Sequence, residues 1–192
     1  MRVTTGAYPV LEERALGPVP RRGLLGGRRD PLELPPLDPG AVLVFEVDGE
    51  YRPLPVRRHL RGTESVVVRA VAVSLVDIRA RVVPVDVVIP TLRAGQVFVV
   101  RATFRCRVTA PATVARAGIT DVAGLLADHL RQDRELLVMG IDAGVEEVVE
   151  ARARIHSRVR AYCMVAPPQV AGIEVVLATV DVAVENGERA GG

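Results

Sequence analysis

The side chains best suited to acid–base, nucleophilic or metal chemistry in this chain of 192 residues are three histidines and two cysteines. His59, His129 and His156 lie far apart in the sequence, and Cys106 and Cys163 belong to no Cys-x-x-Cys or Cys/His spacing. Zinc sites and disulfide frameworks depend on such spacings. We therefore expect buried free thiols and packed or surface histidines, with no metal and no cofactor.

Motifs of the common catalytic sites are also missing from the sequence. No serine or cysteine lies in a Gly-x-Ser-x-Gly pattern, and the glycines of 23–27 lack the Lys-Ser/Thr pair that completes a phosphate-binding loop. Since neither an activated nucleophile nor a phosphate cradle is indicated, we predict that the chain is not an enzyme.

Arginines near the N-terminus are candidates for contact with an anionic surface. Arg21, Arg22, Arg28 and Arg29 lie within one short segment, and such clusters bind lipid headgroups or nucleic acid by releasing counterions. We do not expect nucleic-acid binding, because no aromatic side chain lies among these arginines to stack on a base.

A second set of charges is a candidate for self-association. Arginines alternate with apolar residues along one predicted strand, and glutamates follow one another at the start of a later helix. Because head-to-tail contacts join two different surfaces of one chain, the two sets can meet between neighbouring copies. The alternative is that both sets are solvated. The candidates are Arg101, Arg105, Arg107, Glu146, Glu147 and Glu150.

Composition constrains the elements that must position these side chains. The chain is 49% hydrophobic and 25% charged, with a formal net charge of +2, which excludes a fully disordered or collagen-like protein. Aromatic residues make up 3% and tryptophan is absent, so the core must be aliphatic and rich in valine, which favours strands. The length predicts one domain.

The sequence predicts a cytoplasmic protein. The N-terminus leads into no apolar segment of the kind found in secretory signals, and the valine-rich run 65–76 is broken by Arg69 and is too short to span a membrane. Peripheral contact with the inner membrane is compatible with this location.

Proline, glycine and apolar periodicity divide the chain into three parts. Residues 1–40 are rich in proline and glycine without periodicity, and we expect an extended lead-in. Residues 41–185 form the predicted globular domain, and 186–192 a disordered polar tail.

Strands are predicted for 41–48, 65–76, 79–89, 96–108 and 173–184. The first ends at Asp48-Gly49, a turn dipeptide that suggests a hairpin. Pro84 makes 79–89 an edge or bulged strand, because proline cannot donate to a ladder. Strict alternation in 96–108 places Cys106 on the buried face.

Helices are predicted for 111–117, 121–140 and from Asp142 to the Pro167-Pro168 step. In the second helix, Asp133 intrudes on the apolar stripe, which indicates either a subunit contact or a local irregularity of the helix. In the third, Glu150 and Arg154 have the spacing of an ion pair on the outer face. Strands, then helices, then a strand predict an α+β fold, with a curved, mainly antiparallel sheet and helices on one face.

Several short motifs follow one another in a recognisable order. They are Val76-Asp77-Ile78-Arg79-Ala80-Arg81-Val82-Val83-Pro84-Val85, the turn 90–95 before the strand 96–108, Arg107-Val108 with Ala110-Pro111, Leu130-Arg131, the helix from Asp142, and Gly172-Ile173-Glu174-Val175. This order resembles the SPFH superfamily of stomatins, prohibitins, flotillins and bacterial slipins over roughly residues 41–185. The membrane anchor and long coiled coil usual in that family are not recognised here.

The resemblance implies a non-catalytic SPFH-like scaffold domain that acts by self-association and partner binding, at the cytoplasmic membrane surface. The alternative is a soluble structural or accessory subunit of a larger complex, which docks through strand edges and the arginine-rich lead-in without a membrane role. The expected partners are copies of the same chain or another protein.

Overall fold

The computed structural model describes residues 3–5, 7–19, 27–54, 60–91, 95–141 and 148–186. These residues form α-helices and antiparallel strands, which confirms the α+β class. Residues 41–185, predicted to form one globular domain, are shared between two compact units. Unit 1 comprises Met1–Ala80, Arg107–Asp121 and Ala171–Ile173, and unit 2 comprises Arg81–Cys106, Val122–Val170 and Glu174–Gly192.

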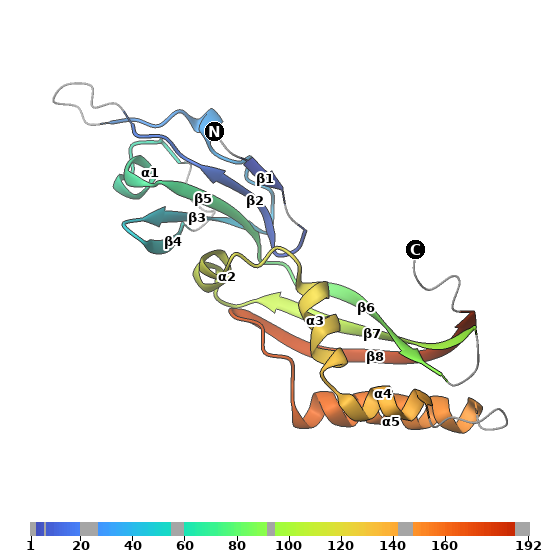
Figure 1. Ribbon diagram of the computed structural model, residues 1–192. Helices are drawn as coiled ribbons and strands as arrows, with labels where there is room; N and C mark the ends of the chain where they lie inside the picture. The colour runs from blue at the N-terminus through green and yellow to red at the C-terminus, as the bar shows by residue number, and fades with distance from the viewer. Residues whose placement is uncertain are drawn as a thin grey trace. The chain divides into compact units, whose positions relative to one another are not determined.

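The sheet of unit 1 has the strand order β1-β2-β5-β3-β4, with antiparallel pairings (Figure 1). Its strands are β1 (Val3–Thr5), β2 (Val10–Ala15), β3 (Ala41–Val47), β4 (Glu50–Leu54) and β5 (Ala72–Asp77). The extended lead-in predicted for 1–40 is therefore wrong in part, because β2 pairs with β5 along its length. Only Val10 of β2 is fully buried, and backbone pairing needs no apolar alternation that the sequence would reveal.

The predicted hairpin at Asp48-Gly49 is confirmed between β3 and β4. Both turn residues have positive φ, 54° at Asp48 and 78° at Gly49. This is the backbone of a type I′ turn, whose twist matches that of the flanking strands. Glycine adopts such a φ without a steric cost.

The strand predicted for 65–76 is partly wrong, because its first turn is the helix α1 (Ser65–Arg69). Valine favours strands, but α1 turns Val67 into the core of unit 1 and packs against β3. Tertiary packing therefore overrides the local preference here. Unit 1 also contains the short 3-10 helix η2 (Pro31–Glu33) and the helix α2 (Pro111–Ala117), which packs against β4.

The sheet of unit 2 has the order β6-β7-β8 and consists of β6 (Arg81–Pro90), β7 (Gln96–Val108) and β8 (Ile173–Asn186). The bounds predicted for β7 and the inward position of Cys106 are confirmed. β6 is an edge strand, as Pro84 predicted, and alternate residues from Val83 to Ile89 are buried. The other face of β6 is exposed.

Helices α3 (Val122–Arg131), α4 (Arg134–Ile141) and α5 (Val148–Val165) complete unit 2. The first two contact β6, and α4 runs beside α5 (Figure 1). The single helix predicted for 121–140 is wrong, since it breaks at Gln132 and Asp133. Asp142, the predicted cap of the next helix, lies outside the described residues.

Candidate protein-contact surfaces

Of the four arginines expected to contact an anionic surface, the structure describes two, and these two differ in exposure. Arg21 and Arg22 lie outside the described residues, and Arg28 is exposed. Arg29 is only 1% exposed, so the prediction that its guanidinium contacts an external surface is wrong. Its side chain is directed into unit 1, where hydrogen-bond acceptors compensate for the loss of water.

Arg29 binds three separate segments of unit 1. Its Nε donates to Val67 O at 2.9 Å, and its Nη2 donates to Ala70 O and Gly17 O, each at 3.0 Å. Nη1 pairs with Glu33 Oε2 at 2.6 Å. Because Val67 and Ala70 lie at the end of α1, where carbonyls lack partners within the helix, Arg29 caps this helix from a distant part of the chain.

The motif that began the family resemblance also has a structural role. The Asp77 carboxylate, fully buried at the end of β5, accepts hydrogen bonds from Arg79 N at 3.0 Å and from Arg79 Nε and Nη2 at 2.9 Å. These bonds to Asp77 raise the pKa of the Arg79 guanidinium above its usual range. The Asp-x-Arg spacing therefore fixes the end of β5.

The arginines of β7 lie on the face of the sheet opposite the buried side chains, as predicted. Arg101 lies 3.9 Å from Asp86, its register partner on β6, and also pairs with Glu185 of β8. Arg105 is exposed and has no carboxylate partner among the described residues, and the same holds for Arg107 at the end of the strand. Of these three arginines, Arg101 alone has its charge compensated by carboxylates in the described part of the chain.

The acidic half of the self-association hypothesis is described only in part. Glu146 and Glu147 lie outside the described residues. Glu150 is exposed on α5, and Arg154 Nε lies 4.0 Å from its Oε1, which confirms the predicted i,i+4 pair. A separation at the limit of an ion pair on an exposed helix contributes little, so the Glu150 carboxylate remains available to another chain.

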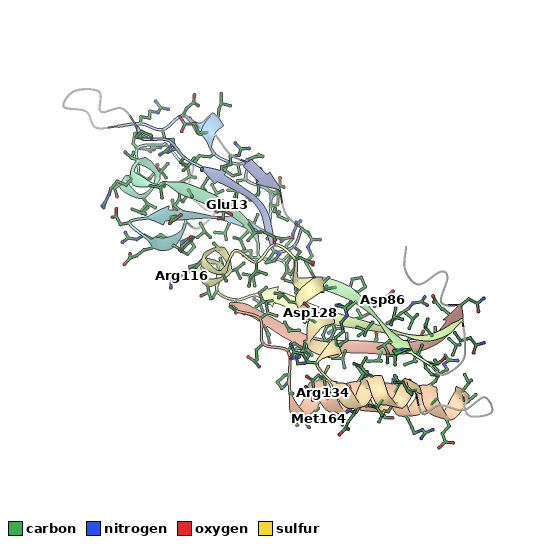
Figure 2. All side chains as sticks on the ribbon, viewed as in Figure 1. Glu13, Asp86, Arg116, Asp128, Arg134 and Met164 are labelled. Carbon is green, nitrogen blue, oxygen red and sulfur yellow. The ribbon has the colours of Figure 1, made fainter. Side chains whose placement is uncertain are left out.

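Apolar side chains accompany the arginines on this outer face of the unit 2 sheet. Val82, directly opposite Arg105 in the β6–β7 ladder, is 66% exposed, and Val176 on β8 is 54% exposed. Asp86 marks the same face in Figure 2. Valines singly exposed need no explanation, whereas several on one sheet face together with an uncompensated arginine are typical of a contact surface.

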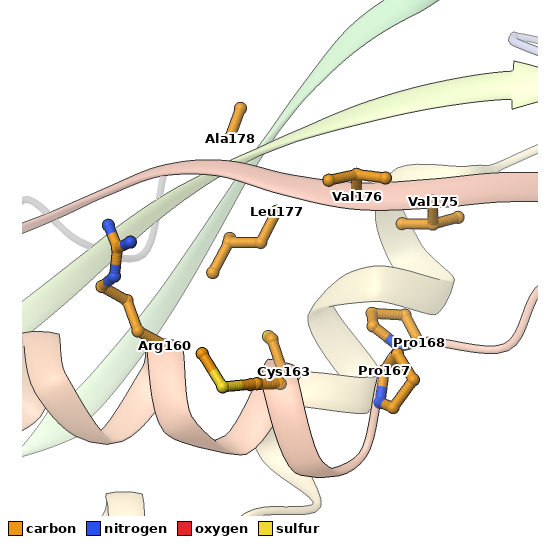
Figure 3. A pocket seen from close by; sticks show the side chains of 9 residues that line it. Arg160, Cys163, Pro167, Pro168, Val175, Val176, Leu177 and Ala178 are labelled. Carbon is orange, nitrogen blue, oxygen red and sulfur yellow. The ribbon is translucent and has the colours of Figure 1, made fainter.

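A pocket of about 280 Å³ lies between β8 and the C-terminal part of α5 (Figure 3). Val175 and Leu177 point from β8 toward the helix, while Ala178 points away. Among the described residues that line the pocket, Arg160 is the one charged residue and none is acidic. Its lining is Arg160, Cys163, Met164, Pro167, Pro168, Val175, Val176, Leu177 and Ala178.

Asp133, the acid that intrudes on the apolar stripe, lies at the break between α3 and α4. It is 4% exposed, and its two carboxylate oxygens accept from Nε and Nη2 of Arg158 on α5, each at 2.7 Å. Arg158 also pairs with Glu135 at 2.5 Å. Of the two alternatives, helix irregularity is confirmed, and the carboxylate is used within unit 2.

The candidate nucleophile and metal ligands lie in environments that favour packing. Cys106 and Cys163 are buried free thiols, as predicted, and burial raises the pKa of each to about 11. A thiol with such a pKa is protonated at neutral pH and is a weak nucleophile. His129 stacks on Tyr162 with ring centroids 4.9 Å apart. His156 lies on α5, and His59 lies outside the described residues.

No three histidine, cysteine, aspartate or glutamate side chains in the described ranges are grouped to hold a metal ion. Within the same ranges, no helix combines the length and apolar character needed to cross a membrane.

Docking through strand edges was predicted in general, but neither β8 nor Arg160 was predicted as a contact feature. The available signal was the absence of proline from 173–186, which distinguishes this run from the other predicted strand edge at 79–89. No feature of the sequence distinguishes Arg160 from the other arginines of its helix, because only the fold determines which of them lie near a carboxylate.

Comparison with models of known protein families and with curated proteins gave no match to this chain. The resemblance to the SPFH superfamily therefore stays a prediction.

Proposed function

We propose that this chain is a non-catalytic scaffold domain that acts by contacting other protein chains, including further copies of itself. The observation that carries the proposal is the outer face of the unit 2 sheet, where exposed Val82 and Val176 accompany Arg105, whose charge no described carboxylate compensates. An antiparallel sheet can keep such a face in water, but apolar area on it favours association.

In the proposed self-association, the outer sheet face of one copy contacts the outer face of α5 in a neighbouring copy. Arg105 supplies the positive charge, and Glu150, held only loosely by Arg154, supplies the negative charge. Because the two surfaces differ, the contact is heterologous and can propagate from copy to copy. Arg101 contributes less than first expected, since Asp86 and Glu185 already compensate it.

Light scattering across a concentration series tests this proposal. We expect the mass to rise with concentration at low salt, and Arg105→Glu to weaken the association by about 3- to 10-fold, because a favourable charge pair becomes repulsive. Arg134→Glu is the matched control, since Arg134 is an exposed arginine of α4 with no carboxylate partner among the described residues. A monomer at every concentration would overturn self-association.

A second candidate function is that of an accessory subunit that docks on a larger complex through a strand edge. The observation that favours it is β8, a strand of 14 residues whose only hydrogen-bonded neighbour in the described sheet is β7. A free edge of this length presents unpaired backbone donors and acceptors to another chain.

Recruitment to the cytoplasmic membrane surface is the part of the scaffold proposal that rests on the N-terminal arginines. Arg21, Arg22 and Arg28 are the residues to change, with Arg29 left in place because it holds unit 1 together. We expect the chain to sediment with anionic liposomes at low salt and the Arg21/Arg22/Arg28→Ser variant not to. Failure of the unmodified chain to sediment would remove the membrane role.

A further inference from the structure

The described sheets have four edge strands, and three of them are closed to further pairing. In unit 1, β1 has three residues, and β4 has five and includes Pro53. In unit 2, β6 contains Pro84 and Pro90 and contacts α3 and α4. Short length, proline and covering helices are the usual means of preventing edge-to-edge association.

The fourth edge, β8, is long and free of proline, and α5 lies beside it. It has 14 residues, none of them proline, and is rich in valine. In its C-terminal half, Arg152 of α5 donates from Nε to Val182 O at 2.6 Å, so the chain supplies its own donor there. In the described part of the chain, no side chain does this for 173–178. The N-terminal half of β8 is therefore the open part.

The pocket beside this open half offers room for a side chain. Val175 and Leu177 form its β8 wall and are only partly buried, and Met164, near the end of α5, is 80% exposed (Figures 2 and 3). A strand added to an edge places alternate side chains on one face. An apolar side chain of such a strand would enter the pocket from the β8 side.

Charge specifies a second feature of the occupant. Three arginines of α5 have carboxylates nearby: Arg152 lies 4.0 Å from Asp181, Arg154 lies 4.0 Å from Glu150, and Arg158 lies 2.7 Å from Asp133. Arg160 is exposed at the pocket and has no such partner among the described residues. A carboxylate on the bound segment would therefore compensate the charge of Arg160.

We propose that the N-terminal half of β8 accepts an extended segment of a partner protein as an added strand, with an apolar side chain in the pocket and an acidic side chain on Arg160. This inference rests on the second proposed function, docking through a strand edge. A second copy is a poorer occupant, because a symmetric β8–β8 contact would bring two pockets and two Arg160 side chains together. The edge β6 of another copy is closed by its prolines.

The test is an NMR titration of the full chain with three synthetic peptides of seven residues. The first alternates valine and threonine around a central glutamate, the second has lysine in place of glutamate, and the third has proline at alternate positions. We expect the glutamate peptide to shift the backbone amides of 173–178 and to bind about 3- to 10-fold more tightly than the lysine peptide at low salt. The proline peptide should not bind.

Charge reversal at the pocket provides the matched variant. Arg160→Glu changes an exposed side chain and should leave the fold intact while reversing the preference in favour of the lysine peptide. Arg154→Glu, on the same helix but with Glu150 as its neighbour, should leave the preference unchanged. Equal binding of all three peptides, shifts elsewhere in the chain, or no shifts at millimolar peptide would overturn the proposal.

Light scattering on the same samples distinguishes strand addition at β8 from self-association through the outer sheet face. Specific peptide binding by a chain that stays monomeric would support strand addition and count against self-association. Concentration-dependent association that the peptides do not compete with, and that Arg160→Glu does not change, would place the contact on the outer sheet face and count against strand addition at β8.

Discussion

Arg29 in unit 1 and Asp133 in unit 2 are both almost fully buried, and they are held by different kinds of partner. Arg29 donates to three backbone carbonyls and to Glu33. Asp133 accepts from one side chain, Arg158. A backbone carbonyl cannot be removed by mutation, whereas a side-chain partner can. The buried charge of Arg29 is therefore harder to replace than that of Asp133.

The largest effect should come from Arg29→Met. The variant leaves the buried carbonyls of Val67 and Ala70 without their donor, and each unsatisfied buried group costs about 1–3 kcal/mol. The carbonyl of Gly17, an exposed residue, loses its donor as well but remains accessible to water. We expect the free energy of unfolding to fall by about 3 kcal/mol or more, measured by urea unfolding. Hydrogen exchange should report the loss at β5. Arg28→Met, at the adjacent exposed position, should stay within about 0.5 kcal/mol of the unmodified chain.

Asp133→Asn should have the next largest effect. It removes the charge that Arg158 faces, but Arg158 keeps Glu135 and is partly exposed, so the cost should be about 2 kcal/mol. The double change Asp133→Leu with Arg158→Met should recover most of this loss, because apolar residues can replace a buried ion pair. If the double variant were no more stable than the single one, the contrast with Arg29 would not hold.

Alkaline pH should destabilise unit 2 through its thiols. Burial raises the pKa of Cys106 and of Cys163 from 9.0 in the unfolded chain to about 11. The unfolded state therefore loses protons first as pH rises from 9 to 11, and the folded state is disfavoured in that window. We expect a loss of about 1.4 kcal/mol for each thiol at pH 10. In denaturation at pH 7.5 and pH 10, Cys106→Ala should show a smaller difference than the unmodified chain.

The smallest effect should be that of Arg116→Gln in unit 1. The Arg116 guanidinium lies 5.9 Å from the centre of the Tyr51 ring, where α2 packs on β4. Exposed cation–π pairs contribute about 0.5–1 kcal/mol, so the free energy of unfolding should fall by no more than this. Arg116→Lys should retain part of the interaction. A larger loss would show that packing of the Arg116 stem, rather than its charge, holds α2 in place.

Elements whose signals are local could be predicted from the sequence. Strict alternation identified β7 from end to end, and Asp48-Gly49 identified the hairpin. In each case the signal is the backbone preference or the periodicity of a few adjacent residues. The predicted edge position of β6 likewise came from one property of Pro84, its missing N–H.

Features that depend on distant partners could not be predicted. β2 has mixed polarity and becomes a strand because β5 is available to pair with it. The valines of α1 favour a strand in isolation, and Arg29 resembles the exposed Arg28 beside it until its carbonyl acceptors are assembled. At β8 the absence of proline was a local signal, but the strand order that makes β8 an edge and the lack of a carboxylate near Arg160 depend on the fold.

The acceptors of Arg29 give the arginine a role in the lifetime of the folded state. They lie 12, 38 and 41 residues away in sequence, so three loops must close before the guanidinium can exchange water for carbonyls. If these contacts form after the rate-limiting step, their removal accelerates unfolding more than it slows folding. We therefore expect Arg29 to slow the unfolding of unit 1. The hairpin and its neighbouring strands should set the rate at which unit 1 folds.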